Sequence, residues 1–104
     1  MTFQQNLATL PTVDHLSGLD VLNSQGEVIH HIPAIAGKLG SLRLYNALAE
    51  QFQQQLNPHS AQHGLQLFAE HVLDAEQNPG KHPNIDLLFA VIADKRSFIL
   101  KPRY

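Results

Sequence analysis

The chain has 104 residues, 43% of them hydrophobic and 15% charged, with a formal net charge of −2 and no cysteine. This composition is typical of one folded domain spanning residues 1–104, and the absence of cysteine excludes disulfides, thiol chemistry and cysteine-based zinc sites. The longest apolar run, residues 87–93, is much shorter than a membrane helix requires. The first ten residues lack the basic start and apolar run of a secretory signal. We therefore expect a cytoplasmic protein without a membrane partner.

The first predicted elements are a short helix and a hairpin. Residues 2–10 form a helix with Thr2 as its cap, and strands 18–22 and 27–32 flank a turn that ends at Gly26. Pairing Leu22 with Val28 would place Asp20 opposite His30. Strand alternation then predicts two faces, one with Leu19, Val21, Ile29 and His31 and the other with Asp20, Leu22, Val28 and His30.

Two long helices follow. Apolar residues at helical spacing predict a helix over residues 41–56, with Ser41 as its cap. Asn57 and Pro58 end this helix and start the next, which extends to about Gln77. The two helices are expected to pack on each other as an αα-hairpin.

The last predicted elements are two strands. Residues 85–93 are apolar on both faces and rich in β-branched side chains, which favours a central strand, and residues 97–101 form the last strand. The order predicts an α+β, two-layer fold: a mostly antiparallel four-stranded sheet of two hairpins, covered on one face by the αα-hairpin, plus the short N-terminal helix. The other sheet face, lined by Leu88, Ala90 and Ile92, would need a partner, which favours a homodimer.

Two of the seven histidines, His59 and His63, stand four residues apart on a predicted helix, the spacing that brings two ligands to one metal ion. A third ligand would have to come from elsewhere, such as His82 or a second subunit. The alternative, which we favour, is two exposed histidines at a helix start. No other cofactor than such a divalent transition metal is indicated.

The predicted pair of Asp20 and His30 is the supporting half of many general-base sites. No motif places a serine nucleophile, and a cross-strand Asp–His pair on a solvent-exposed face is the more common occurrence. No catalytic residue is assigned.

Residues 37–41 lead into a helix whose first turn carries Arg43. Flexible glycines, helix N–H groups and two cations predict an anion site that comprises Lys38, Gly40, Ser41 and Arg43. The alternative is an ordinary loop before a helix.

Four of the seven Lys and Arg residues lie in the last ten positions. Without a nucleic-acid-binding motif, this basic end is more simply a solvated hairpin, so a nucleic-acid partner is not expected.

Residues 18–44, from the first strand through the glycine-containing loop, resemble a family of small proteobacterial proteins known only as a domain of unknown function. The resemblance implies a bacterial protein and carries no activity. Our hypothesis is a small, non-catalytic binding or interaction module that forms a homodimer or binds another protein. One alternative is a metal- or His-dependent enzyme that uses His59 and His63, or Asp20 and His30. Another is a binder of a phosphorylated ligand or nucleic acid through Lys38, Arg43 and the basic C-terminal end.

Overall fold

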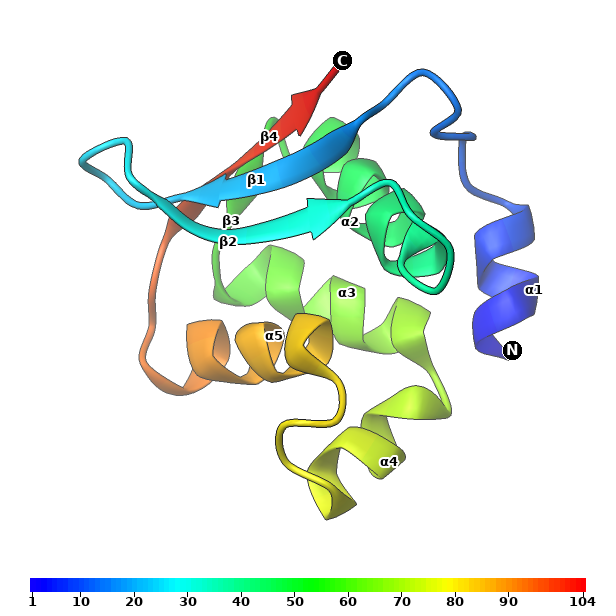
Figure 1. The fold of residues 1–104 in the computed structure, drawn as a ribbon. Helices are drawn as coiled ribbons and strands as arrows, with labels where there is room; N and C mark the ends of the chain where they lie inside the picture. Colours follow the sequence, from blue (N-terminus) through cyan, green and yellow to red (C-terminus); the bar gives the residue numbers. More distant parts are fainter.

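A computed structural model describes residues 1–104 and contains five helices and four strands. In chain order these are α1 (Phe3–Ala8), β1 (Gly18–Leu22), β2 (Val28–Pro33), α2 (Leu39–Gln51), β3 (Gln55–Leu56), α3 (Pro58–Phe68), α4 (His71–Gln77), α5 (Pro83–Ala93) and β4 (Phe98–Arg103). The α+β class predicted from the sequence is confirmed (Figure 1).

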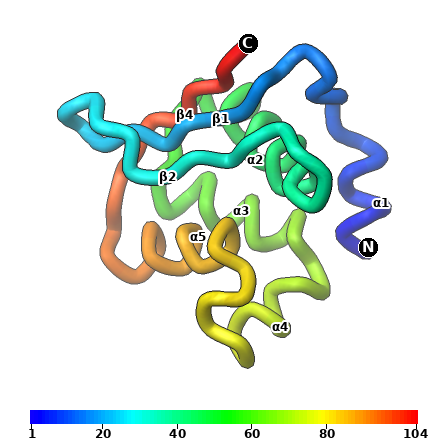
Figure 2. Tube along the Cα trace, in the orientation of Figure 1, coloured from blue at the N-terminus to red at the C-terminus, as the bar shows by residue number.

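The strands form one antiparallel sheet in the order β2-β1-β4-β3. Its inner face is buried against the helices through Leu19, Val21, Ile32 and Leu100. The helices gather on this side of the sheet, with α2 directly beneath the strands and α3 beyond it (Figures 1 and 2). The opposite face carries Asp20 and other partly exposed side chains, because successive strand residues point to opposite faces.

The first hairpin is confirmed, but its register is not. Leu22 pairs with Val28 as predicted, and the Asn23 side chain accepts the backbone N–H groups of Gln25 and Glu27 to hold the turn. A bulge then shifts the pairing, so that Asp20 lies opposite His31 instead of His30. One extra residue in β2 therefore exchanges the predicted faces of the two histidines.

The first long helix is shorter than predicted at its C-terminal end. α2 ends at Gln51, and Gln53 and Gln54 adopt positive φ angles of 55° and 66°. This left-handed turn reverses the chain and delivers residues 55 and 56 to the sheet as β3. No glycine marks the turn, which removes the usual sequence signal for a helix end.

The second long helix is divided in two. Asn57 caps α3 as predicted, because its side chain accepts the Ser60 N–H while the Ser60 hydroxyl accepts the Asn57 N–H. At Ala69 the φ angle is 53° and the ψ angle is −118°, which ends α3 and starts α4 in a new direction. The chain from Asn57 to Gln77 therefore bends around the core.

The predicted strand over residues 85–93 is wrong, because this segment forms helix α5. Leu88 is fully buried in the helical layer and Ala90 and Ile92 lie on the same helix, so these residues do not line a free sheet face. The fourth strand is β3, and there is no second hairpin. The last strand, predicted over residues 97–101, instead spans Phe98–Arg103 and includes Pro102.

Candidate functional site

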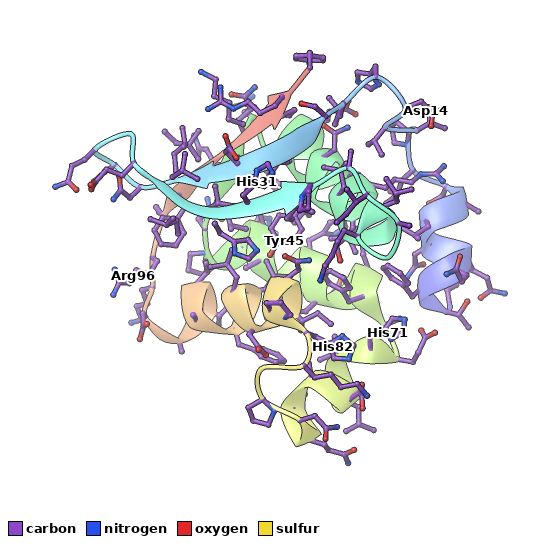
Figure 3. All side chains as sticks on the ribbon, viewed as in Figure 1. Asp14, His31, Tyr45, His71, His82 and Arg96 are labelled. Carbon is purple, nitrogen blue, oxygen red and sulfur yellow. The ribbon has the colours of Figure 1, made fainter.

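A cleft with a volume of about 870 Å³ opens between three parts of the chain. One side is α1 with the segment that follows it, a second is the connection from β2 into α2, and the third is the α4–α5 region. Figure 3 shows Asp14 on the first of these parts and His71 beside His82 on the third. A cleft of this size falls in the range of small-molecule binding sites.

The start of α2 lies in this cleft without a cap. Lys38 occupies the N-cap position, no side chain caps the helix, and the backbone N–H groups of Leu39, Gly40 and Ser41 donate to no protein atom. All four residues line the cleft. Ser41 was predicted to cap the helix, but it lies inside the first turn instead. Free N–H groups and the positive end of a helix dipole are favourable to an anion.

Arg43, in the first turns of α2, connects this helix to the segment after α1. Its Nη2 donates to the Leu10 carbonyl at 2.6 Å, and its Nε donates to the carbonyls of Leu10 and Pro11. These bonds hold the segment after α1 against α2. The remaining nitrogen, Nη1, makes no hydrogen bond to the protein. Arg43 therefore contributes positive charge to the cleft while much of its hydrogen bonding is already committed.

Helix α1 forms one wall through its fixed position. The Thr2 side chain caps it, and the Phe3 N–H donates to Glu70 Oε1 at 2.7 Å. This backbone hydrogen bond lowers the pKa of Glu70. The Phe3 ring stacks on Phe68 with centroids 5.4 Å apart and meets the edge of His71 at 4.9 Å. Six residues are too few for a stable isolated helix, so these contacts hold α1 in place.

The α4–α5 wall contains a carboxylate–imidazole pair that the sequence did not predict. Asp74 Oδ2 accepts a hydrogen bond from His82 Nε2 at 2.6 Å. The same oxygen forms an ion pair with Lys81 Nζ at 3.0 Å. The hydrogen bonds from His82 and Lys81 lower the pKa of Asp74 to about 2. The His82 ring lies 5.9 Å from the ring of His71, centroid to centroid. His71, Lys81 and His82 all line the cleft.

Asn84 is the most buried polar residue of the cleft, with only 7% of its surface exposed. Its Oδ1 accepts from His30 Nε2 at 2.6 Å, and its backbone carbonyl accepts the Tyr45 hydroxyl at 2.5 Å. Tyr45 is fully buried, which raises the pKa of its hydroxyl. The Asn84 Nδ2 has no protein partner and is not sealed from solvent. Asn84 itself lines the cleft.

A family model described as "Uncharacterized protein conserved in bacteria (DUF2322)" matches residues 3–102, nearly the whole chain. The chain belongs to this family. The match includes residues 18–44 and confirms the resemblance to a bacterial family of unknown function. Comparisons with curated proteins and with solved structures found no match for this DUF2322 chain. None of its helices combines the length and apolarity needed to cross a membrane.

The predicted anion residues of the DUF2322 chain, Lys38, Gly40, Ser41 and Arg43, all line the one cleft. The four basic residues of the C-terminal end do not line it. Lys95 and Arg96 lie in the turn after α5, and Arg103 pairs with Asp20 on the outer sheet face. The predicted cooperation between the start of α2 and the basic end therefore has no support in the fold.

The predicted Asp20–His30 pair does not form. Asp20 accepts from His31 Nδ1 at 2.6 Å and from Arg103 Nε at 2.8 Å, on the outer face of the sheet. Partial burial acts to raise the pKa of Asp20, but the hydrogen bonds from Arg103 and His31 outweigh it and lower the pKa. This arrangement is an ion pair between strands on an open surface, away from the cleft.

His59 and His63 lie on one side of α3, as their spacing predicts. Each ring meets Phe52 at a centroid distance of 5.5 Å. No group of three or more His, Asp or Glu side chains is arranged to hold a metal ion, and His82 is engaged with Asp74 instead. The structure therefore provides no third ligand for a metal ion bound by His59 and His63. Metal binding by these two histidines stays a prediction.

Proposed function

We propose that this protein is a small cytoplasmic binding domain without catalytic activity of its own, and that it binds a small organic anion in the cleft. The observation that carries the proposal is the uncapped start of α2, where three free N–H groups open into the cleft beside Lys38. Lys38 makes no ion pair within the protein. Helix N-termini of this kind bind phosphates and carboxylates.

The charge of the cleft supports an anionic ligand. The chain as a whole has a net charge of −2, yet Lys38 and Arg43 line the cleft against a single acidic residue, Asp14, while the third lining cation, Lys81, is paired with Asp74. Positive charge gathered in a concave surface raises the local concentration of anions. Asn84, which also lines the cleft, has an Nδ2 group that donates to no protein atom and is accessible to solvent.

The test is calorimetric titration of the full chain with inorganic phosphate at low ionic strength. We expect the Lys38→Gln variant to bind about tenfold more weakly, because it removes a charged donor. The matched control is Lys101→Gln, which removes the same charge from the outer sheet face, and its affinity should be unchanged. An equal loss in both variants, or no phosphate binding by the native chain, contradicts the proposal.

A homodimer is the second part of the proposal. Val28, Leu22 and Ile99 are register neighbours across β2, β1 and β4, and Ile29 lies beside them at the bulge. Val28, Ile29 and Ile99 are each more than two-fifths exposed. This apolar row on the outer face replaces the one predicted from residues 88–92, and a second copy would bury it.

Light scattering at micromolar concentration tests the dimer. The native chain should have twice the monomer mass, and Ile99→Asp should convert it to a monomer because it places a charge in the contact. His59→Asp, exposed on α3, provides the control substitution and should stay dimeric. A native chain that is monomeric under these conditions contradicts this part of the proposal.

A further inference from the structure

The cleft has polar groups on two separate walls. At the start of α2 stand the free N–H groups and Lys38, and on the α4–α5 wall stand His71, His82 and Asn84. The lining also includes the apolar side chains of Phe3, Phe68 and Ile85.

The imidazole of His82 has a fixed orientation. Because Asp74 accepts from its Nε2, the neutral ring carries its proton there and leaves Nδ1 without a hydrogen bond. When the ring is protonated, Nδ1 becomes a second donor. His82 lines the cleft with about a quarter of its side chain exposed. The α4–α5 wall can therefore offer a charge-assisted donor beside His71.

Asn84, on the same wall, has a side-chain amide atom that is available to a ligand. Only 7% of the surface of this residue is exposed, yet its amide nitrogen has no partner in the protein. If the amide were turned over, the oxygen would be the unpartnered atom instead, so one polar atom remains free in either orientation. In a residue that is otherwise buried, this unpartnered atom is accessible to solvent and is therefore available to a ligand in the cleft.

We propose that the ligand is a small organic molecule with two acidic groups joined by a short aliphatic chain, such as a dicarboxylate or a phosphorylated carboxylate. One acidic group binds at the start of α2, and the other binds to the α4–α5 wall through His71, His82 and Asn84. The aliphatic chain lies along the apolar lining near Phe3 and Ile85. This inference rests on the anion site proposed above and defines the class of its ligand.

The second group makes binding depend on pH. A protonated imidazole at His71 or His82 would add positive charge next to the second acidic group, so a dianion should bind more tightly at lower pH. The charged groups on the elements around this pair are the Met1 amine, Glu70, Asp74, Glu76, Lys81 and Asp86. Asp74 stays ionised at pH 6, since its pKa is about 2.

The experiment compares glutarate, a dicarboxylate, with butyrate, a monocarboxylate of similar length, and with inorganic phosphate. Affinities are measured by calorimetry at pH 6 and pH 8. At pH 6 we expect glutarate to bind at least about tenfold more tightly than butyrate. This advantage, the ratio of the two affinities, should be smaller at pH 8. His82→Asn should remove most of that advantage and leave phosphate affinity unchanged. His71→Asn should show the same pattern more weakly.

The outcomes separate the two proposals. Equal affinities for glutarate and butyrate, or a His82→Asn variant that retains the full advantage, overturn the two-group ligand while phosphate binding at α2 survives. No binding of phosphate, butyrate or glutarate overturns the anion site itself. Thermal unfolding of each variant shows whether it is folded, and Lys95→Gln serves as the matched surface control because it lies outside the cleft.

Discussion

Gly40 of α2 lies against the ring of Phe3 from α1. A Cβ atom built at Gly40 would fall 3.1 Å from Phe3 Cζ and 3.2 Å from Cε2. This contact brings α1 close to the first turn of α2 and so places a wall beside the free N–H groups. The cleft therefore depends on the absence of a side chain at one helical position.

Replacing Gly40 with valine should displace α1. The added atoms cannot fit beside Phe3, and overpacking of this kind costs about 1–3 kcal/mol of unfolding free energy. Urea unfolding gives the stability, and hydrogen exchange of the Phe3 amide, now bonded to Glu70, reports the position of α1. Gly40→Ala should lose less, because alanine favours the helix by about 1 kcal/mol. A valine variant with native stability and a protected Phe3 amide contradicts this account.

Replacing Ala69 with glycine should stabilise the protein. Ala69 has a φ angle of 53° and a ψ angle of −118°, a backbone conformation that glycine adopts far more readily than alanine. Relief of this strain should exceed the entropy cost of glycine and raise the unfolding free energy by about 1 kcal/mol. Ala61→Gly, inside helix α3, should instead destabilise by about 1 kcal/mol. Similar losses in both variants would show that Ala69 is not strained.

The Asp74 cluster predicts a defined loss of stability in acid. The folded-state pKa of Asp74 is about 2, below its ordinary value of 3.8, so the ionised carboxylate favours the folded state. Its contribution is complete above about pH 4 and is lost as pH falls from 3.8 through 2. Urea midpoints measured across this range should fall less steeply for Asp74→Asn than for the native chain.

The control for this experiment is Asp94→Asn, which removes an exposed carboxylate that makes no ion pair. Its acid dependence should match that of the native chain. The role of Asp74 is refuted if the two variants show the same profile between pH 4 and pH 2.

Local signals predicted the start of the fold well, and tertiary packing determined the rest. The Thr2 and Asn57 caps and the turn at Gly26 are short-range features that the sequence states directly. Helix α5 was mistaken for a strand because Leu87, Phe89 and Ile92 are apolar on its partly buried side. Its fully buried residues, Ile85, Leu88 and Val91, recur every three positions, which is the helical signal that the apolar background concealed.

The site, like the fold, was predictable where it depends on residues that are close together in the sequence. The anion residues were recognisable because they are contiguous, from Lys38 to Arg43. The Asp74–His82 pair depends on how α4 and the α4–α5 connection fold back on each other, which no periodicity records. The Asp20 partner was misassigned by one residue because the bulge in β2 leaves no glycine or proline signal.

The most direct test of anion binding in the cleft is a ¹H–¹⁵N NMR titration of the native chain with inorganic phosphate at low ionic strength. The account predicts saturable downfield shifts of the amide protons of Leu39, Gly40 and Ser41, because these free N–H groups would donate to the bound anion. The first-turn amides of α3, where the Asn57 side chain already caps the helix, should shift little. Absence of shifts at residues 39–41, or equal shifts at both helices, would contradict the central claim.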